Sequence, residues 1–160
     1  MDWTKFDRKI RLEASAESIY NAWMNIDEIQ KWFLRKITVL NMENEKVLTQ
    51  GDKIIWNWHN TDFPQEVEIL KNEPFEQLAF TFGHEMEVHI TIKKEGQFNV
   101  VHLQQRNIPT GDKSKYNFYA GCMRGWTFWL ANLKAFLDHG ICLHDTNLGP
   151  RDDLFDFSNT

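Results

Sequence analysis

The sequence predicts an α+β fold in which a curved antiparallel sheet of about six or seven strands packs around one long C-terminal helix. Two observations support this prediction. Apolar residues recur at every second position over most of residues 36–105, as they do in strands with one buried face. They then recur at steps of three and four over residues 116–141, as they do along one face of a helix.

The N-terminal elements are predicted from alternation and from capping residues. Residues 5–13 alternate between apolar and polar side chains, which indicates a first strand. Ser15 is a suitable N-cap for a helix that continues to about Met24. Asp27, with Gln30 three residues later, has the spacing of a capping box and predicts a second short helix.

The remaining strands are predicted from sets of apolar residues that share a parity. These sets are Ile37 and Val39; Ile54, Trp56 and Trp58; Val67 and Ile69; Leu78, Phe80 and Phe82; Met86, Val88, Ile90 and Ile92; and Val101, Leu103 and Gln105. Glu95 and Gly96 predict a tight hairpin between the last two strands. Asn72-Glu73-Pro74 and Gly83-His84-Glu85 interrupt the alternation and predict two further turns.

The long helix is predicted to follow a loop. Residues 107–115 contain Pro109 and Gly111, which favour a loop, and the helical pattern then begins at Tyr116. Gly140 is suited to the C′ position that ends such a helix. The side chains expected to face the sheet are Met123, Trp126, Trp129, Leu130, Leu133 and Phe136.

Two glycines, Gly121 and Gly125, lie inside this predicted helix. A glycine in a helix interior costs roughly 1 kcal/mol relative to alanine, so the pair needs a structural reason. Close approach of a neighbouring element is one reason. Space for a ligand, or a bend that gates a cavity, is the other. Of the two we favour close approach.

Residues 1–142 are expected to form a single domain, and residues 143–160 a polar C-terminal tail. A chain of 160 residues buries roughly 70% of its unfolded surface, which is enough for a core without metals or disulfides. The tail is acidic, and we expect it to dock loosely through one or more of its apolar residues. These are Leu148, Leu154, Phe155 and Phe157.

Charge and composition argue against two classes of protein. The net charge is −5 and no cluster of Lys or Arg is present, so nucleic acid is not an expected partner. No apolar run reaches 18 residues, so membrane insertion is not expected. The N-terminal residues have no apolar segment of the signal-peptide kind, which makes a cytoplasmic location the default expectation.

The sequence contains no recognisable catalytic, metal-binding or cofactor-binding motif. The six histidines do not pair at metal-ligand spacing on one predicted element, and two cysteines are too few for a disulfide framework. Cys122 is expected to be a small buried residue. No phosphate-binding glycine loop or nucleophile elbow is present. No cofactor is therefore expected, and an enzyme is the third alternative after the two described below.

Four segments together resemble the family named for activators of the heat-shock protein 90 ATPase. They are residues 14–23 at the entry to the first helix, residues 29–33 with Trp32 and Phe33, Gly51-Asp52 before a strand, and Gly125-Trp126 with the leucines that follow. The resemblance covers about residues 4 to 142. Relatives often carry proline where Ala16 stands, and many carry histidine where Gln105 stands.

This resemblance implies the helix-grip fold of the START-like (SRPBCC, or birch-pollen-allergen-like) superfamily. It also implies a chaperone as a partner and a role in the stress response. It does not settle function, because one such fold hosts many activities.

A cavity between the sheet and the long helix is the predicted binding site, and plain core packing of the same residues is the alternative. A small hydrophobic or amphipathic molecule is the first expected partner, and a chaperone-associated interaction domain is the second reading. The sequence leaves the oligomeric state open, with a homodimer as one expectation. The residues expected to line the cavity are Trp23, Trp32, Phe33, Trp56, Trp58, Phe80, Phe82, Gln105, Met123, Trp126, Trp129 and Leu130.

Gln105 has a special place in this set because it is polar at an apolar-parity position. We expect its amide to accept a hydrogen bond from the indole of Trp56 or Trp58, or to orient a ligand. Exposure at the end of the strand is the alternative.

Overall fold

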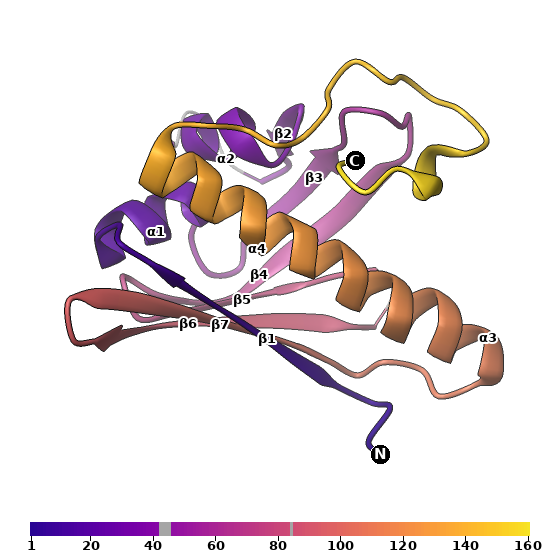
Figure 1. The fold of residues 1–160 in the computed structure, drawn as a ribbon, viewed down its shortest axis with the longest axis horizontal. Coiled ribbons are helices and arrows are strands. Elements are labelled where there is room, and N and C mark those ends of the chain that lie inside the picture. The colour runs from indigo at the N-terminus through magenta and orange to yellow at the C-terminus, as the bar shows by residue number, and fades with distance from the viewer. Residues whose placement is uncertain (42–45, 84) are drawn as a thin grey trace.

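A computed structural model describes residues 1–41, 46–83 and 85–160 and shows one seven-stranded antiparallel sheet. The strands follow the order β1-β7-β6-β5-β4-β3-β2, so the first strand pairs with the last and the others form a meander. Figure 1 shows the long helix α4 lying across one face of this curved sheet. The strands are β1 (Phe6–Leu12), β2 (Lys36–Val39), β3 (Lys53–Asn57), β4 (Pro64–Glu73), β5 (Gln77–Thr81), β6 (Glu87–Glu95) and β7 (Phe98–Arg106).

The helices are short except for one, and the predicted α+β architecture is confirmed. Figure 1 shows α1 and α2 grouped at one end of the sheet, and the C-terminal segment running back from α4 toward the other end. The helices are α1 (Ala16–Met24), α2 (Ile26–Trp32), α3 (Asp112–Ser114), the π-helix η1 (Lys115–Ala120), α4 (Gly121–His139) and the 3-10 turn η2 (Leu154–Asp156).

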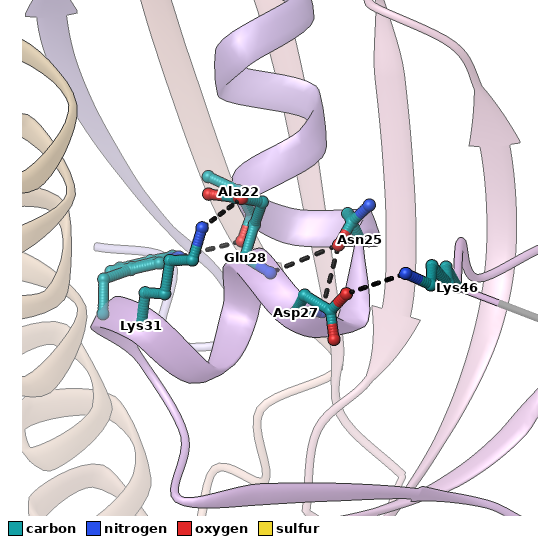
Figure 2. Close-up of polar contacts among 7 residues, drawn as sticks. Ala22, Asn25, Asp27, Glu28, Lys31 and Lys46 are labelled. Atoms are coloured by element: carbon teal, nitrogen blue, oxygen red, sulfur yellow. Dashed lines mark hydrogen bonds and ion pairs between the residues drawn. The ribbon is translucent and has the colours of Figure 1, made fainter.

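The cap of α2 differs from the prediction. Ser15 caps α1 as expected, because its Oγ accepts a hydrogen bond from the Ser18 amide. The cap of α2, however, is Asn25, whose Oδ1 accepts hydrogen bonds from the amides of Asp27 and Glu28 (Figure 2). Asp27 therefore lies inside the first turn, where a negative charge favours the helix dipole. Helix α2 follows α1 with only Asn25 between them, which leaves no room for a cap at residue 27.

The helical region begins earlier than predicted. Residues 112–115 were expected in a loop but form α3 and the start of η1, with Gly111 as the N-cap. Asp112 lies in the first turn and its carboxylate is 3.2 Å from Lys115 Nζ, which favours helix over loop. The end of α4 is as predicted, since Gly140 adopts the left-handed conformation with φ of 67°.

Two of the three predicted turns lie between strands as expected, whereas Asn72 and Glu73 of the third belong to the end of β4 and the turn follows at residues 74–76. Gly96, with φ of 60°, lies in the hairpin between β6 and β7, and Gly83, with φ of 57°, lies between β5 and β6. His84, in the middle of the predicted second turn, is outside the described residues.

The core between the sheet and the helices is dominated by aromatic side chains, with Phe33 at its centre. Phe33 is 1% exposed, and its ring centroid lies 4.8 Å from that of Trp129, 5.2 Å from that of Trp56 and 5.0 Å from that of Trp32. The Trp32 indole donates a hydrogen bond to the Ala22 carbonyl at 2.8 Å. The Trp32-Phe33 pair thus joins α2 to the sheet and to α4.

The C-terminal half of α4 is held by two buried polar side chains. Asn132 donates to the Trp32 carbonyl at 2.7 Å and accepts from the Leu143 amide at 2.6 Å. The Asp138 carboxylate accepts hydrogen bonds from the amides of Glu13 and Ala14 and pairs with Lys134 Nζ at 2.6 Å. Within the described ranges, no helix has the length and apolar character needed to span a bilayer.

Candidate functional site

A cleft of about 940 Å³ opens beside the other half of α4. Its walls come from α4 between Gly121 and Trp129, from the connection after β3 and the first two residues of β4, and from the C-terminal segment from Leu154 onward. Figure 1 shows why these segments meet: the C-terminal segment leaves the far end of α4 and returns to the side where β3 ends and β4 begins. The cleft is therefore formed by segments that lie far apart in the sequence.

Four aromatic side chains form the apolar wall of the cleft. Trp126 and Trp129 project from α4 one turn apart, while Trp58 and Phe82 directly follow β3 and β5. The ring centroids of Trp126 and Phe82 are 5.0 Å apart, and those of Trp58 and Trp129 are 5.9 Å apart. Trp126 and Trp129 are only 2% and 6% exposed, so the apolar surface within reach of a bound molecule comes mainly from the half-buried Trp58 and Phe82.

The two helix glycines both line the cleft. A Cβ placed on Gly125 would meet no atom within 4 Å, and one on Gly121 would meet only the Tyr116 carbonyl oxygen at 3.7 Å. Close approach of a neighbouring element, the reason favoured from the sequence, is therefore wrong for Gly125. The space above Gly125 belongs to the cleft instead.

The π-helix η1 forms one side of the mouth. Tyr116, Asn117 and Ala120 from this segment line the cleft, and Tyr116 is 79% exposed. A π-turn holds one more residue than an α-turn, and such turns occur frequently at functional sites. Here the wider turn lies directly before Gly121, at the point where α4 borders the cleft.

The C-terminal segment is fixed over the cleft mainly by polar contacts. Asn60 donates to the Asp145 carbonyl at 2.6 Å and accepts from the Gly149 amide at 3.2 Å. Arg124 donates to the Phe155 carbonyl at 3.2 Å. Of the apolar tethers expected from the sequence, Leu154 is buried, Leu148 is half-buried, and Phe155 and Phe157 are exposed.

The cleft contains two neutral histidines. His59 and His144 pack edge to face at 5.0 Å, and His144 also packs on Trp129 at 4.8 Å. Burial, and then the neighbouring His59, lower the pKa of His144 to about 4. Burial, and then Arg35, also lower the pKa of His59. At neutral pH the His144 ring is therefore uncharged, and its Nδ1 is buried without a hydrogen-bond partner in the described part of the chain.

A second unpaired polar atom on the wall belongs to Gln65. Its Oε1 accepts a hydrogen bond from the Trp58 indole at 3.3 Å. Its Nε2 is buried and has no partner among the residues that the structure describes. The wall thus combines aromatic side chains with the Gln65 amide nitrogen, a donor that lacks a hydrogen-bond partner in the described chain.

The cleft also holds Cys122, whose pKa is raised by burial. A protonated thiol is a poor nucleophile and a poor metal ligand. Across residues 1–41, 46–83 and 85–160, no three His, Cys, Asp or Glu side chains gather in a way that would hold a metal ion.

The structure separates the twelve predicted cavity residues into two groups. Trp58, Phe82, Trp126 and Trp129 line the cleft. The others lie away from its wall, either buried in the core or, for Met123, half-buried. These are Trp23, Trp32, Phe33, Trp56, Phe80, Gln105, Met123 and Leu130.

Gln105 is fully buried rather than exposed at a strand end, and its partner differs from the expected one. Its Oε1 accepts a hydrogen bond from the Trp126 indole at 2.8 Å, and its Nε2 is 3.1 Å from Met86 Sδ. Trp58 donates to Gln65 instead, and Trp56 Nε1 has no partner among the described residues. Gln105 therefore orients the Trp126 ring from behind the cleft wall.

Sequence reasoning missed three parts of the cleft: the π-helix, the connection with His59 and Gln65, and the C-terminal segment with His144. Gln65 carried a signal, because it has the parity of the buried Val67 and Ile69 while being polar. Gly125 carried a second signal, because a glycine inside a predicted helix needs a structural reason. The C-terminal segment carried none, since its placement depends on hydrogen bonds from Asn60 to backbone groups far along the chain.

Comparisons with known proteins identify a family for this chain and several similar structures. The family model described as "Activator of Hsp90 ATPase homolog 1-like protein" matches residues 13–138. A search of curated proteins finds no match.

Several solved structures are similar to the chain at low sequence identity. A Staphylococcus saprophyticus protein is 20% identical, with a TM-score of 0.73 over 88% of this chain and 96% of that one. The Aha1 dimer from Colwellia psychrerythraea is also 20% identical, with a TM-score of 0.69 over 85% and 97%. A Mesorhizobium loti protein is 16% identical, with a TM-score of 0.68 over 86% and 98%. At these identities the likeness concerns the fold.

Proposed function

The chain belongs to the family of activator of Hsp90 ATPase homolog 1-like proteins, and from this premise we propose that it binds a small, largely apolar ligand in the cleft beside α4. The observation that carries the proposal is the open space above Gly125, enclosed by the indoles of Trp58, Trp126 and Trp129.

The size and lining of the cleft support this proposal. Small-molecule sites typically measure about 300–1,000 Å³ and combine apolar walls with a few polar groups, and the cleft is of this kind. The half-buried Trp58 and Phe82 provide apolar contact, while Gln65 and His144 are polar residues of the lining.

Binding without turnover fits the residues of the cleft better than catalysis does. Burial raises the pKa of the Cys122 thiol, and the histidine–carboxylate hydrogen bonds of the described chain involve His89 and His102 rather than the two histidines of the cleft. A nucleophile–base pair of the kind used in covalent catalysis is thus not assembled among these residues.

A substitution that fills the cleft tests the proposal. Gly125→Leu places a side chain in the open space, and Ala131→Leu, at an exposed position of the same helix, is the matched control. In a thermal-shift screen of apolar and aromatic compounds, hits should raise the Tm of the wild type and of Ala131→Leu but not of Gly125→Leu. Equal shifts for all three proteins would place binding elsewhere, and the absence of any hit would count against a ligand-binding role.

A chaperone-associated interaction domain is the second candidate, favoured by the family description and by exposed aromatic residues. Phe63 is 83% exposed and Phe155 is 77% exposed, and both lie at the cleft. Large exposed aromatic side chains are typical of interaction surfaces. A pull-down with heat-shock protein 90 and a measurement of its ATPase rate would decide, since no association and no rate change would remove this candidate.

The same exposed aromatics bear on the expected homodimer. A similar protein from Colwellia psychrerythraea was solved as a dimer. Light scattering of the wild type and of Phe63→Ser would show whether this chain self-associates through the cleft mouth.

A further inference from the structure

The amide of Gln65 is oriented by its neighbours. Gln65 lies on the inward face of β4, in line with the buried Val67 and Ile69, and is paired across the sheet with Trp56. The Trp58 indole donates to Gln65 Oε1 at 3.3 Å. An indole N–H can only donate, so this contact fixes the oxygen toward Trp58 and directs the amide nitrogen away from it.

The amide nitrogen has no hydrogen-bond partner in the described part of the chain, although it is buried. A buried donor without a partner is unfavourable, and nearly all such groups in native proteins are paired. Gln65 lines the cleft. The nitrogen itself has almost no accessible surface, so a bound molecule with an acceptor oxygen would complete the missing hydrogen bond after the amide turns slightly toward the cleft.

The charge of the cleft indicates what kind of molecule this is. The charged side chains on its walls are Arg124 and Asp156, which have opposite signs, and Arg124 is turned toward the Phe155 carbonyl. His144 and His59 are held neutral by burial, since the pKa of each is lowered. No net charge on the described walls is available to bind an ion.

We propose that the Gln65 side-chain nitrogen forms a hydrogen-bonding subsite that selects uncharged, flat, apolar ligands carrying a carbonyl oxygen over analogues that lack it. The inference rests on the proposed ligand-binding function and specifies the chemical class of the ligand. The indoles contact the apolar body of the ligand, and Gln65 donates to its oxygen. His144 Nδ1, also buried and unpaired among the described residues, adds a second polar atom on the wall that the C-terminal segment provides.

A matched pair of probes tests this selectivity. Fluorenone and fluorene have the same tricyclic frame and differ by one carbonyl oxygen. We expect the wild type to bind fluorenone about tenfold more tightly than fluorene, because one net hydrogen bond is worth roughly a factor of ten in affinity. Quenching of tryptophan fluorescence by each probe gives the two affinities.

Two variants identify the donor. Gln65→Met keeps a side chain of similar volume but has no N–H group, so the preference for fluorenone should fall to less than about twofold. Glu66→Gln, at the next and exposed position of β4, is the control and should keep the tenfold preference. A Gln65→Met protein that still prefers fluorenone tenfold would overturn the assignment to Gln65.

The outcomes also separate this inference from the function on which it rests. Equal binding of the two probes by the wild type would overturn the subsite while leaving the ligand-binding function standing. Binding of neither probe would overturn both. If Gln65→Met does not fold, the infrared carbonyl band of fluorenone bound to the wild type decides. A shift to lower wavenumber shows the hydrogen bond, and an unshifted band excludes it.

Discussion

The two halves of α4 differ in what they border: the C-terminal half is tied to other parts of the fold, and the N-terminal half lies along the cleft. In the C-terminal half, Asn132 and Asp138 pair with backbone groups of α2, of the chain before α1 and of the C-terminal segment. In the N-terminal half, Gly121 and Gly125 line the cleft, and the opposite walls of the cleft carry polar atoms of Gln65 and His144 without partners in the described chain.

This difference separates two roles within one helix. The C-terminal half anchors the helix to three separate parts of the fold, so changes there should affect stability most. The N-terminal half contains two glycines of low helix propensity next to a cleft. Natural proteins depart from locally optimal residues mainly at functional sites, so the contrast marks the N-terminal half as the binding end.

The strongest test of the anchored half is Asp138→Ala. The Asp138 side chain is 0% exposed and accepts hydrogen bonds from two backbone amides as well as pairing with Lys134. We expect the free energy of unfolding to fall by about 3 kcal/mol, because two hydrogen bonds to a charged acceptor and the pairing with Lys134 are lost together. Urea denaturation at pH 7 measures the change.

Asp62→Ala, at an exposed position, is the control and should stay within about 0.5 kcal/mol of the wild type. The loss of unfolding free energy caused by Asp138→Ala should also depend on pH. Burial alone would raise the pKa of Asp138, but hydrogen bonds from Lys134, Glu13 and Ala14 outweigh it and lower the pKa. The stabilisation is therefore present above the unfolded pKa of 3.8 and disappears as the pH falls through the lowered value. A loss below 1 kcal/mol at pH 7 would contradict the anchoring role.

In the N-terminal half of α4, a substitution should raise the free energy of unfolding rather than lower it. Gly125→Ala should raise the free energy of unfolding by about 1 kcal/mol, since alanine favours the helix and the new Cβ meets no atom within 4 Å. Ala131→Gly, at an exposed position of the same helix, should lower it by about 1 kcal/mol. Thermal denaturation of both variants gives the comparison, and destabilisation by Gly125→Ala would show that this position is closely packed after all.

The smallest expected effect is local and depends on pH. His144 titrates near 6.5 in an unfolded chain and near 4 when its segment is docked. The unfolded segment therefore binds a proton first, and the free energy of docking should decline as the pH falls from 6.5 to 4. Hydrogen exchange at the Gly149 amide, corrected for its intrinsic pH dependence, reports this docking.

His144→Phe keeps a ring on Trp129 and should flatten that pH dependence, while His102→Gln on the other face of the sheet should not. If both variants retain the wild-type profile, docking of the segment does not depend on the charge of His144.

The sheet, α1, α2 and the end of α4 could be predicted from the sequence because their signals are local. Alternation, the Ser15 cap and Gly140 each depend on residues close in the chain. The prediction of the α2 cap was wrong because Asn25 and Asp27 are both good capping residues. Only the tight junction after α1 decides between them. The predicted start of the helical region was wrong for a similar reason, since Gly111 is compatible with a loop and with the start of a helix equally well.

The cleft was harder to predict because parity shows which face is buried but not whether the buried space is filled. Trp56 and Trp58 share a parity, yet one lies in the core and the other on the cleft wall. Trp58 borders the cleft whose other side is the returning C-terminal segment. Asn60 holds this segment through hydrogen bonds to residues that lie 85 and 89 positions farther along the chain. Such long-range pairing leaves no periodic signal.

The pairing of β1 with β7 has a consequence for how the protein is made. Phe6 lies opposite Gln105 in the register, so the edge of β7 stays unpaired until the two strands meet across most of the chain. Loop closure over this distance is slow, and an unpaired edge strand can associate with other chains in the meantime. During synthesis β1 emerges first and must wait for β7, so the yield of folded protein should depend on temperature and concentration during translation more strongly than its final stability suggests.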